Sequence, residues 1–352
     1  MDVTRRARVA GLYVDQYSTL LPRTCWSNEH GGPDGHLPGG GAYWTQGWRE
    51  IIDDARAGMR AGNPDGGLYS EGFSDAFVGH SDGFLIGHES FDEGIPSAIA
   101  VYHDTAIFIA RHVELLDIKF PGPLADLTTA QKAPGLAAGL QRTVGLQAEA
   151  FVEGRLPGGL VNNYAGHLES HAYAYVRQLG AWRRSFADSL VYGEMLEPPM
   201  LYQVGDAVSE ECAVTNSDNG IPAIVATEAG VSVAGQQGPW TALDSFTMSA
   251  TAKEGGSAAS WQEPTATASL WKTRAGGLQV VIASAVTTHR RTVLVAIPQV
   301  LGQVSGTASV LRHSQSGAVV ESDQIPFFLN LLLFEVSLPA CGVAVLSLEP
   351  NP

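Results

Sequence analysis

Two short apolar runs, each ending in a carboxylate, constrain the fold of this chain more than any other feature. The first, Val9–Val14, ends at Asp15, and the second lies within Gly66–Phe73 and ends at Glu71. A strand buried inside a parallel sheet reads as a continuous apolar run, whereas a half-exposed strand alternates apolar and polar residues. Parallel sheets and barrels place their chemistry at the carboxyl ends of such strands. We therefore expect both carboxylates at one edge of a parallel sheet.

The composition indicates a globular protein and narrows its partners. Hydrophobic residues make up 45% of the 352 residues and charged residues only 16%, and such a chain buries a sizeable core. The formal net charge of −15 argues against a nucleic-acid partner, because the phosphates would be repelled. An uncharged or cationic substrate, such as a neutral sugar, fits this charge better.

Cysteine spacing and hydropathy exclude further classes. Cys25, Cys212 and Cys341 are widely spaced and odd in number, so we expect neither a disulfide framework nor a zinc ribbon. No run of 18 apolar residues occurs, which predicts a soluble protein without a transmembrane helix or a membrane partner. No signal peptide opens the chain, but an export signal could precede these residues. The sequence therefore leaves the localisation open between cytoplasmic and secreted.

The pattern of residues 1–198 predicts the strand–helix units of a (β/α) barrel. Apolar residues recur at helical spacing, and other short runs read as buried strands. The predicted helices cover 42–62, 105–116, 128–153 and 167–192, and the further strands are Asp82–Gly87, Ile95–Asp104 and Gly158–Asn163. A complete TIM-type barrel has eight such units, and none is predicted before Val9. Residues 1–198 therefore resemble the C-terminal part of a barrel.

The pattern of residues 199–352 is different and predicts an antiparallel β-sandwich. Short strands recur with Ser, Thr and Gly turns between them, which is typical of all-β domains. They are Ile221–Ala226, Leu278–Ala283, Thr292–Ile297, Ala308–Arg312, Leu331–Val336 and Val343–Leu348. The expected fold class is thus α/β plus all-β: a partial TIM-type barrel followed by a C-terminal β-sandwich.

Asp15 and Glu71 are the candidate catalytic pair. Hydrolysis of a glycosidic bond needs one carboxylate to attack or stabilise the anomeric carbon and one protonated acid to help the leaving group depart. Tyr and Phe side chains flank both acids in the sequence, and aromatic rings offer flat apolar faces to sugars. The alternative is that each carboxylate only caps the helix that follows it.

Six further residues are candidates for binding substrate. Three lie in a long loop rich in Gly, Pro and His, and loops of that length are usually functional or disordered. The other three lie next to predicted strands, where they could bind hydroxyl groups or tune the pKa of the acid. The six are Trp26, His30, His36, Asp82, His103 and Asp104. The alternative is that they cap helices or bond to the backbone of their own loops.

The histidines raise a metal site as another alternative. His167 and His171 stand four residues apart, on one face of a predicted helix. In the zincin motif the glutamate directly follows the first histidine, whereas Glu169 is two positions on. Gly39–Gly41 precede a helix, but no Lys-Ser/Thr follows, so a phosphate loop is not indicated. We therefore predict no metal and no cofactor.

Several motifs in one order resemble a largely uncharacterised family of bacterial proteins, catalogued as predicted barrel glycoside hydrolases. The motifs are Gly11-Leu-Tyr-Val-Asp-Gln16, His30 to Gly41, Tyr43-Trp-Thr-Gln-Gly-Trp48, Tyr69-Ser-Glu-Gly72, Ile95-Pro to Asp104 and Tyr192-Gly-Glu-Met-Leu-Glu-Pro-Pro199. More distantly, the strand-end aspartate is similar to the nucleophile of the α-galactosidase and α-glucosidase clan. The resemblance covers residues 9–200 and implies a glycosidase with Asp15 as nucleophile and Glu71 as acid/base.

The chain departs from this family in one respect, because the family's barrel has strands before the Asp15 strand. We expect those strands to come from a missing N-terminal segment or from self-association. Two other functions stay open: a non-catalytic carbohydrate-binding or assembly module on a truncated barrel, and a metal-dependent hydrolase that uses the histidines.

Overall fold

The computed structural model forms two compact units. One contains Met1–Glu89 and Val101–Ile109, and the other contains Ser90–Ala100 and Ala110–Pro352. The structure describes residues 10–15, 17–18, 24–26, 42–86, 97–110, 128–157, 166–209, 213–216, 222–225, 230–233, 240–250, 259–297, 305–313, 319–328 and 332–350. The sequence predicts a domain boundary between residues 198 and 199, and this boundary stays a prediction. The two compact units divide the chain at other positions.

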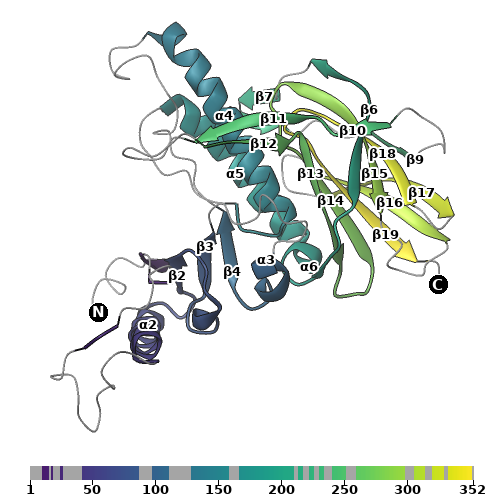
Figure 1. Cartoon of the computed structure of the whole chain (residues 1–352). Coiled ribbons are helices and arrows are strands. Elements are labelled where there is room, and N and C mark those ends of the chain that lie inside the picture. Colours follow the sequence, from purple (N-terminus) through teal and green to yellow (C-terminus); the bar gives the residue numbers. More distant parts are fainter. Residues whose placement is uncertain are drawn as a thin grey trace. The chain divides into compact units, whose positions relative to one another are not determined.

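The first unit is built on a four-stranded sheet in the order β1-β2-β3-β4. Figure 1 labels β2, β3 and β4 of this sheet. Strands β1, β2 and β3 pair in parallel. The helix α2 connects β1 to β2 and packs against β2. The elements in chain order are β1 (Gly11–Val14), α2 (Tyr43–Gly62), β2 (Gly67–Glu71), η2 (Asp75–Phe77), β3 (Gly83–Ile86), α3 (Ser97–Tyr102) and β4 (Ile107–Ala110). The division between the two compact units falls within α3 and before the last residue of β4.

The two faces of this sheet differ because side chains alternate along a strand. Leu68, Phe84 and Phe108 point to one face, and each of them is almost fully buried. The other face carries glycines at neighbouring positions of three strands, Gly11, Gly67 and Gly83. A Cβ atom on Gly11 would lie 2.7 Å from a ring carbon of Tyr69, and one on Gly83 would lie 2.9 Å from the same ring. The glycines therefore leave the room that the Tyr69 ring occupies on the sheet.

The second unit is a sandwich of two antiparallel sheets, with strand orders β10-β6-β15-β18-β9 and β17-β16-β19-β14-β13-β5. Shorter ladders join β11 to β12 and β7 to β8. The strands are β5 (Glu194–Leu196), β6 (Met200–Ser209), β7 (Ala213–Asn216), β8 (Pro222–Val225), β9 (Gly230–Val233), β10 (Trp240–Ala242), β11 (Ser245–Ala250), β12 (Ala259–Pro264), β13 (Ala266–Lys272), β14 (Leu278–Ser284), β15 (His289–Ile297), β16 (Ser305–His313), β17 (Val319–Phe328), β18 (Leu332–Leu338) and β19 (Val343–Pro350).

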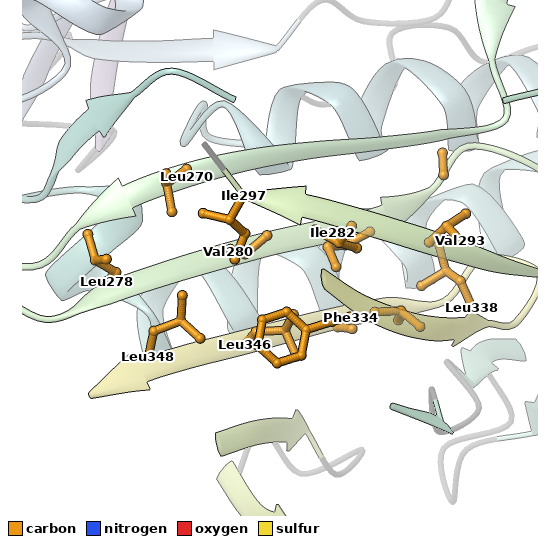
Figure 2. Close-up of a cluster of buried hydrophobic side chains, with 14 residues drawn as sticks. Leu270, Leu278, Val280, Ile282, Val293, Ile297, Phe334, Leu338, Leu346 and Leu348 are labelled. Carbon is orange, nitrogen blue, oxygen red and sulfur yellow. The ribbon is translucent and has the colours of Figure 1, made fainter. Parts of the chain in front are cut away.

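The core of the sandwich lies between its two sheets. Val280 and Leu346 of the six-stranded sheet gather with Val293 and Phe334 of the five-stranded sheet in one buried cluster (Figure 2). Full burial of such a side chain stabilises the fold by about 1.5–3 kcal/mol relative to its exposure. This cluster explains why short apolar strands with polar turns fold as two stacked sheets.

Helices cover the other face of the six-stranded sheet. They are α4 (Thr129–Val152), α5 (Gly166–Ser185) and α6 (Ala187–Leu190). Phe151 of α4 and Trp182 of α5 pack with Trp271 and Val281 of the sheet. Because β14 is buried on both faces, its sequence is apolar almost throughout and does not alternate. No helix in the described ranges is long and apolar enough to cross a membrane.

The structure confirms the predicted fold class, an α/β part with a parallel sheet followed by antiparallel β structure. It also confirms a helix within 42–62 and another within 128–153. The strand predicted at Ile95–Asp104 is wrong, because α3 lies there, and the helix predicted over 105–116 is wrong at its start, where β4 lies. A short apolar run carries no period that separates helix from strand. The strand predicted at Gly158–Asn163 lies outside the described residues.

One cysteine of the described residues forms a disulfide. This residue is Cys341, which is also buried. Cys341 has a positive φ of 56°, a conformation that side chains other than glycine rarely adopt. Spacing along the chain predicted no disulfide framework, but wide spacing does not prevent two cysteines from meeting in the fold.

Candidate active site at the carboxyl ends of β1 and β2

Asp15 and Glu71 lie at the same edge of the parallel sheet. The register pairs Gly11 with Gly67 and runs to Val14 opposite Ser70. The next residues on the two chains are Asp15 and Glu71, so they stand side by side on neighbouring strands. Parallel strands lie about 4.8 Å apart, which brings the backbones of the two acids close together. Asp15 is exposed and Glu71 is half-buried.

The negative charges of Asp15 and Glu71 both affect the hydroxyl group of Tyr13. The pKa of Tyr13 is raised to about 12, mainly by burial and then by the negative charges of Glu71 and Asp15. Tyr13 pairs with Tyr69 in register. Glu71 lies two residues after Tyr69 and therefore on the same face of the sheet. The site therefore combines a half-exposed phenol with two carboxylates at one strand end.

The turn after Glu71 is tightly bonded. The N–H of Gly72 donates a hydrogen bond of 2.7 Å to the carbonyl of Leu85, the residue that pairs with Glu71 on β3. Gly72 adopts a φ of 69°, and glycine reaches this left-handed region without steric cost. A residue with a Cβ atom would be strained here, so the sequence Glu71-Gly72 suits an abrupt strand end.

The aromatic residues near the two acids play different parts. Tyr13 is 51% exposed, whereas Tyr17 is fully buried. Phe73 packs in an aromatic cluster with Phe84, Tyr102 and Phe108, with ring centroids 5.2–5.5 Å from its own. Tyr17 and Phe73 therefore support the fold, and Tyr13 offers an open ring beside the carboxylates.

Asp82 lies at the opposite edge of the sheet from Asp15 and Glu71, because it directly precedes β3. Its Oδ2 accepts a hydrogen bond of 2.8 Å from the backbone N–H of Leu68, and its Oδ1 accepts bonds from Arg56 and Arg60 of α2. These bonds tie α2 to the amino ends of β2 and β3. The structure does not bring Asp82 together with the two candidate catalytic acids.

His103 and Asp104 also stand before a strand and not after one. They lie in the turn between α3 and β4, at the amino end of β4. The exposed carboxylate of Asp104 accepts a hydrogen bond of 3.0 Å from the hydroxyl of Thr105. Their assignment to substrate stays a prediction, and their position, like that of Asp82, gives it no support.

The candidates of the long loop are only partly described. Trp26 is 72% exposed, which is compatible with a contact to substrate. His30 and His36 lie outside the described residues, as do the side chains of His167 and His171. Among the side chains that the structure describes, no three His, Cys, Asp or Glu residues gather in a way that could hold a metal ion.

Comparison with protein families gives a match over the N-terminal third of the chain. Residues 1–112 match a family model described as "Domain of unknown function (DUF6259)". Both candidate acids lie within this segment.

Two curated relatives carry names that state an activity. "Putative glycoside hydrolase 22789" of Monosiga brevicollis is 25% identical over 219 residues, which are 59% of this chain and 18% of that protein. "Putative glycoside hydrolase" of Bacteroides thetaiotaomicron is 25% identical over 110 residues, which are 30% of this chain and 16% of that protein. The chain thus spans less than a fifth of the length of either relative.

Among solved structures, a noncanonic maltogenic alpha-amylase, AmyB, from Thermotoga neapolitana is similar with a TM-score of 0.39 and 10% identity. The similarity covers 99% of this chain and 64% of the amylase chain. Sequence similarity therefore joins this chain to proteins named as glycoside hydrolases, and the family match includes the strand ends that carry Asp15 and Glu71.

Proposed function

We propose that this chain carries the catalytic carboxylates of a glycoside hydrolase, with Asp15 as the nucleophile and Glu71 as the general acid/base. The observation that carries the proposal is the register of β1 and β2, which sets the two acids side by side at one strand end. The names of the two curated relatives support the same reaction class.

The chemistry assigns different work to the two acids. Asp15 would attack the anomeric carbon, and Glu71, in its protonated form, would give its proton to the leaving oxygen. Glu71 would then take a proton from the water that releases the sugar from Asp15. This sequence retains the anomeric configuration and requires the carboxyl groups about 5–5.5 Å apart. A separation of about 6.5–9.5 Å would instead make Asp15 the base of an inverting enzyme.

A carbohydrate is the substrate class of this proposal, with the open ring of Tyr13 beside the acids as a surface for a sugar ring. Trp26, His30 and His36 would contact more distant parts of the substrate. The proposal keeps residues 1–198 as part of a catalytic barrel and 199–352 as the sandwich domain. The described sheet of the first unit has four strands, so further strands, from a longer polypeptide or from a second copy, would complete an eight-stranded barrel.

The test is turnover of aryl glycosides by Asp15→Asn and Glu71→Gln. We expect Asp15→Asn to lower kcat/KM by about 10³-fold or more, as loss of a nucleophile does. Glu71→Gln should lower it by about 10²–10⁴-fold on a substrate with a poor leaving group. The loss should be much smaller with a nitrophenolate leaving group, which needs no proton to depart.

Asp65→Asn is the matched control for these variants. Asp65 is an exposed carboxylate of the same unit, in the turn before β2 and therefore at the other end of that strand. Its turnover should equal that of the unchanged chain. Full activity of Asp15→Asn would remove Asp15 from the mechanism. Sugar binding without turnover, kept in both acid variants, would instead indicate the carbohydrate-binding module.

A further inference from the structure

The residues that follow Asp15 include two buried side chains, Tyr17 and Ser18. Tyr17, two residues on, is fully buried. Its ring stacks on Trp48 of α2 with centroids 5.8 Å apart and meets the edge of Phe77 at 5.2 Å. Its hydroxyl is hydrogen-bonded to that of Ser81. These contacts anchor the segment that follows Asp15 to the buried side of the unit.

Ser18 then connects this segment to the end of β2. Its Oγ lies 2.6 Å from the carbonyl oxygen of Glu71, 3.0 Å from that of Gly72 and 2.9 Å from the hydroxyl oxygen of Ser70. A hydroxyl group has one hydrogen to donate and can also accept. The geometry fits Ser18 donating to the Glu71 carbonyl and accepting from Ser70. Both serines are buried, with 7% and 0% exposure.

The peptide that follows Glu71 is consequently held from both sides. The hydroxyl of Ser18 donates to the carbonyl of Glu71 on one side of this peptide. On the other side, the N–H of Gly72 donates to the carbonyl of Leu85 on β3. Ser18 is also only three residues from Asp15. A single buried hydroxyl therefore links the backbone after one candidate acid to the backbone of the other.

We infer that Ser18 is a positioning residue that holds the carboxylates of Asp15 and Glu71 in a constant mutual arrangement. The inference rests on the proposed function for its catalytic consequence, but the arrangement itself can be measured without turnover. Loss of this bond would leave both acids chemically intact and let the two strand ends move apart. Displacements of about 1 Å can cost about 10²-fold in rate.

The test compares Ser18→Ala, Ser18→Thr and Ser18→Cys with Ser189→Ala. The Thr variant keeps the donor, and the Cys variant keeps the size with a weaker donor. Ser189 is the matched control because it is equally buried and lies in the second compact unit. Its Oγ also donates to a backbone carbonyl, that of Phe186, at 3.0 Å.

The first readout is the ¹³C NMR spectrum of the two carboxyl groups at neutral pH, recorded on protein labelled with ¹³C at the Asp and Glu carboxyl carbons. Asp15→Asn and Glu71→Gln assign the two signals. In the unchanged chain the signal of each acid should move when the other acid is replaced by its amide, because the two residues end neighbouring strands. This response of one signal to the other residue is the coupling between the two sites. In Ser18→Ala and Ser18→Cys the response to the neighbour should shrink by at least half. It should persist in Ser18→Thr and Ser189→Ala.

The second readout is the pH profile of kcat on an aryl glycoside. We expect Ser18→Ala to lower kcat by 10- to 100-fold with a small change in KM and a displaced acid limb, and Ser18→Thr to restore both. If Ser18→Ala does not fold, the comparison of Ser18→Cys with Ser18→Thr decides the question in the same way.

The outcomes separate the inference from the proposed function. Unchanged coupling and unchanged kcat in Ser18→Ala and Ser18→Cys would overturn the positioning role, even with Asp15→Asn inactive. Absence of coupling in the unchanged chain, or an equal loss in Ser189→Ala, would overturn it as well. Coupling that depends on Ser18 in a chain without turnover would support the positioning role and reject the glycosidase.

Discussion

The negative charges of both candidate acids act on the hydroxyl group of Tyr13. Its ring is half-exposed, and its pKa is raised to about 12 by burial and then by the charges of Glu71 and Asp15. A phenol with this pKa stays protonated at neutral and mildly alkaline pH. Tyr13 is therefore a permanent hydrogen-bond donor beside two acids.

The raised pKa of Tyr13 predicts how stability depends on alkaline pH. The unfolded chain loses the phenol proton near pH 10, whereas the folded chain holds it to about pH 12. Below pH 10 both states are protonated, so the group adds no pH dependence. Between pH 10 and about 12 the unfolded state binds fewer protons, and the free energy of unfolding falls as pH rises.

Replacement of Tyr13 by Phe removes this contribution. We expect the free energy of unfolding of Tyr13→Phe to fall less than that of the unchanged chain from pH 10 to 12. From pH 7 to 9.5 the difference in this free energy between the two proteins should stay constant. Urea unfolding measures both. Other buried tyrosines, such as Tyr17 and Tyr175, titrate in both proteins and cancel in the comparison. Parallel stability curves up to pH 12 would show that the pKa of Tyr13 is not raised in the folded chain.

At the scale of elements, glycines decide how closely the strands of the first unit approach. A Cβ atom on Gly83 would clash with the backbone carbonyl of Ile107 on β4 and with the Tyr69 ring. Backbone cannot swing away as the end of a flexible side chain can. By contrast, a Cβ atom on Gly47 of α2 would have no other atom within 4 Å.

These surroundings predict opposite effects of two Gly→Ala changes. Gly83→Ala should lower the free energy of unfolding by about 1–3 kcal/mol, because it overpacks the sheet. Gly47→Ala should raise it by about 0.5–1 kcal/mol, because alanine restricts the unfolded chain and favours helix. Urea unfolding followed by circular dichroism measures both. Equal effects of the same sign would show that β3 and β4 are not packed as described.

Elements with strong local signals were predictable from the sequence. The helix α4 begins after Thr128, whose side chain and that of Gln131 form a reciprocal capping box, a signature visible in the letters alone. Ser97–Tyr102 was not predictable, because five apolar residues after Ser97, with β-branched Ile99 and Val101, fit a strand as well as a helix. Contacts with the rest of the fold settle such a segment.

The candidate site likewise contains residues that a local sequence pattern predicts and residues whose role depends on distant contacts. Asp15 and Glu71 each end an apolar run, so a local pattern places them at one sheet edge. The role of Ser18 depends on Ser70, Glu71 and Gly72, which lie 52 to 54 positions away, and no local pattern carries that information. The sequence predicts Asp104 at the end of a strand, whereas Asp104 lies between the helix α3 and the strand β4.

At the scale of the whole molecule, the net charge affects the binding of any charged ligand. The sequence has 36 acidic residues against 21 Lys and Arg, a formal net charge of −15. Such a surface repels anions over about 10 Å at 0.1 M salt and about 3 Å at 1 M. A neutral sugar feels none of this long-range repulsion.

The net charge therefore predicts how binding responds to salt. Affinity for a neutral oligosaccharide should change by less than about twofold between 50 mM and 500 mM NaCl, because no charge pair forms or breaks. A polyuronate of equal length should bind more weakly at 50 mM, and its affinity should rise with salt as the repulsion is screened. Isothermal titration calorimetry on the Glu71→Gln variant measures both without turnover. Binding of the polyuronate that weakens with salt would reveal a cationic subsite and exclude a neutral sugar as the preferred substrate.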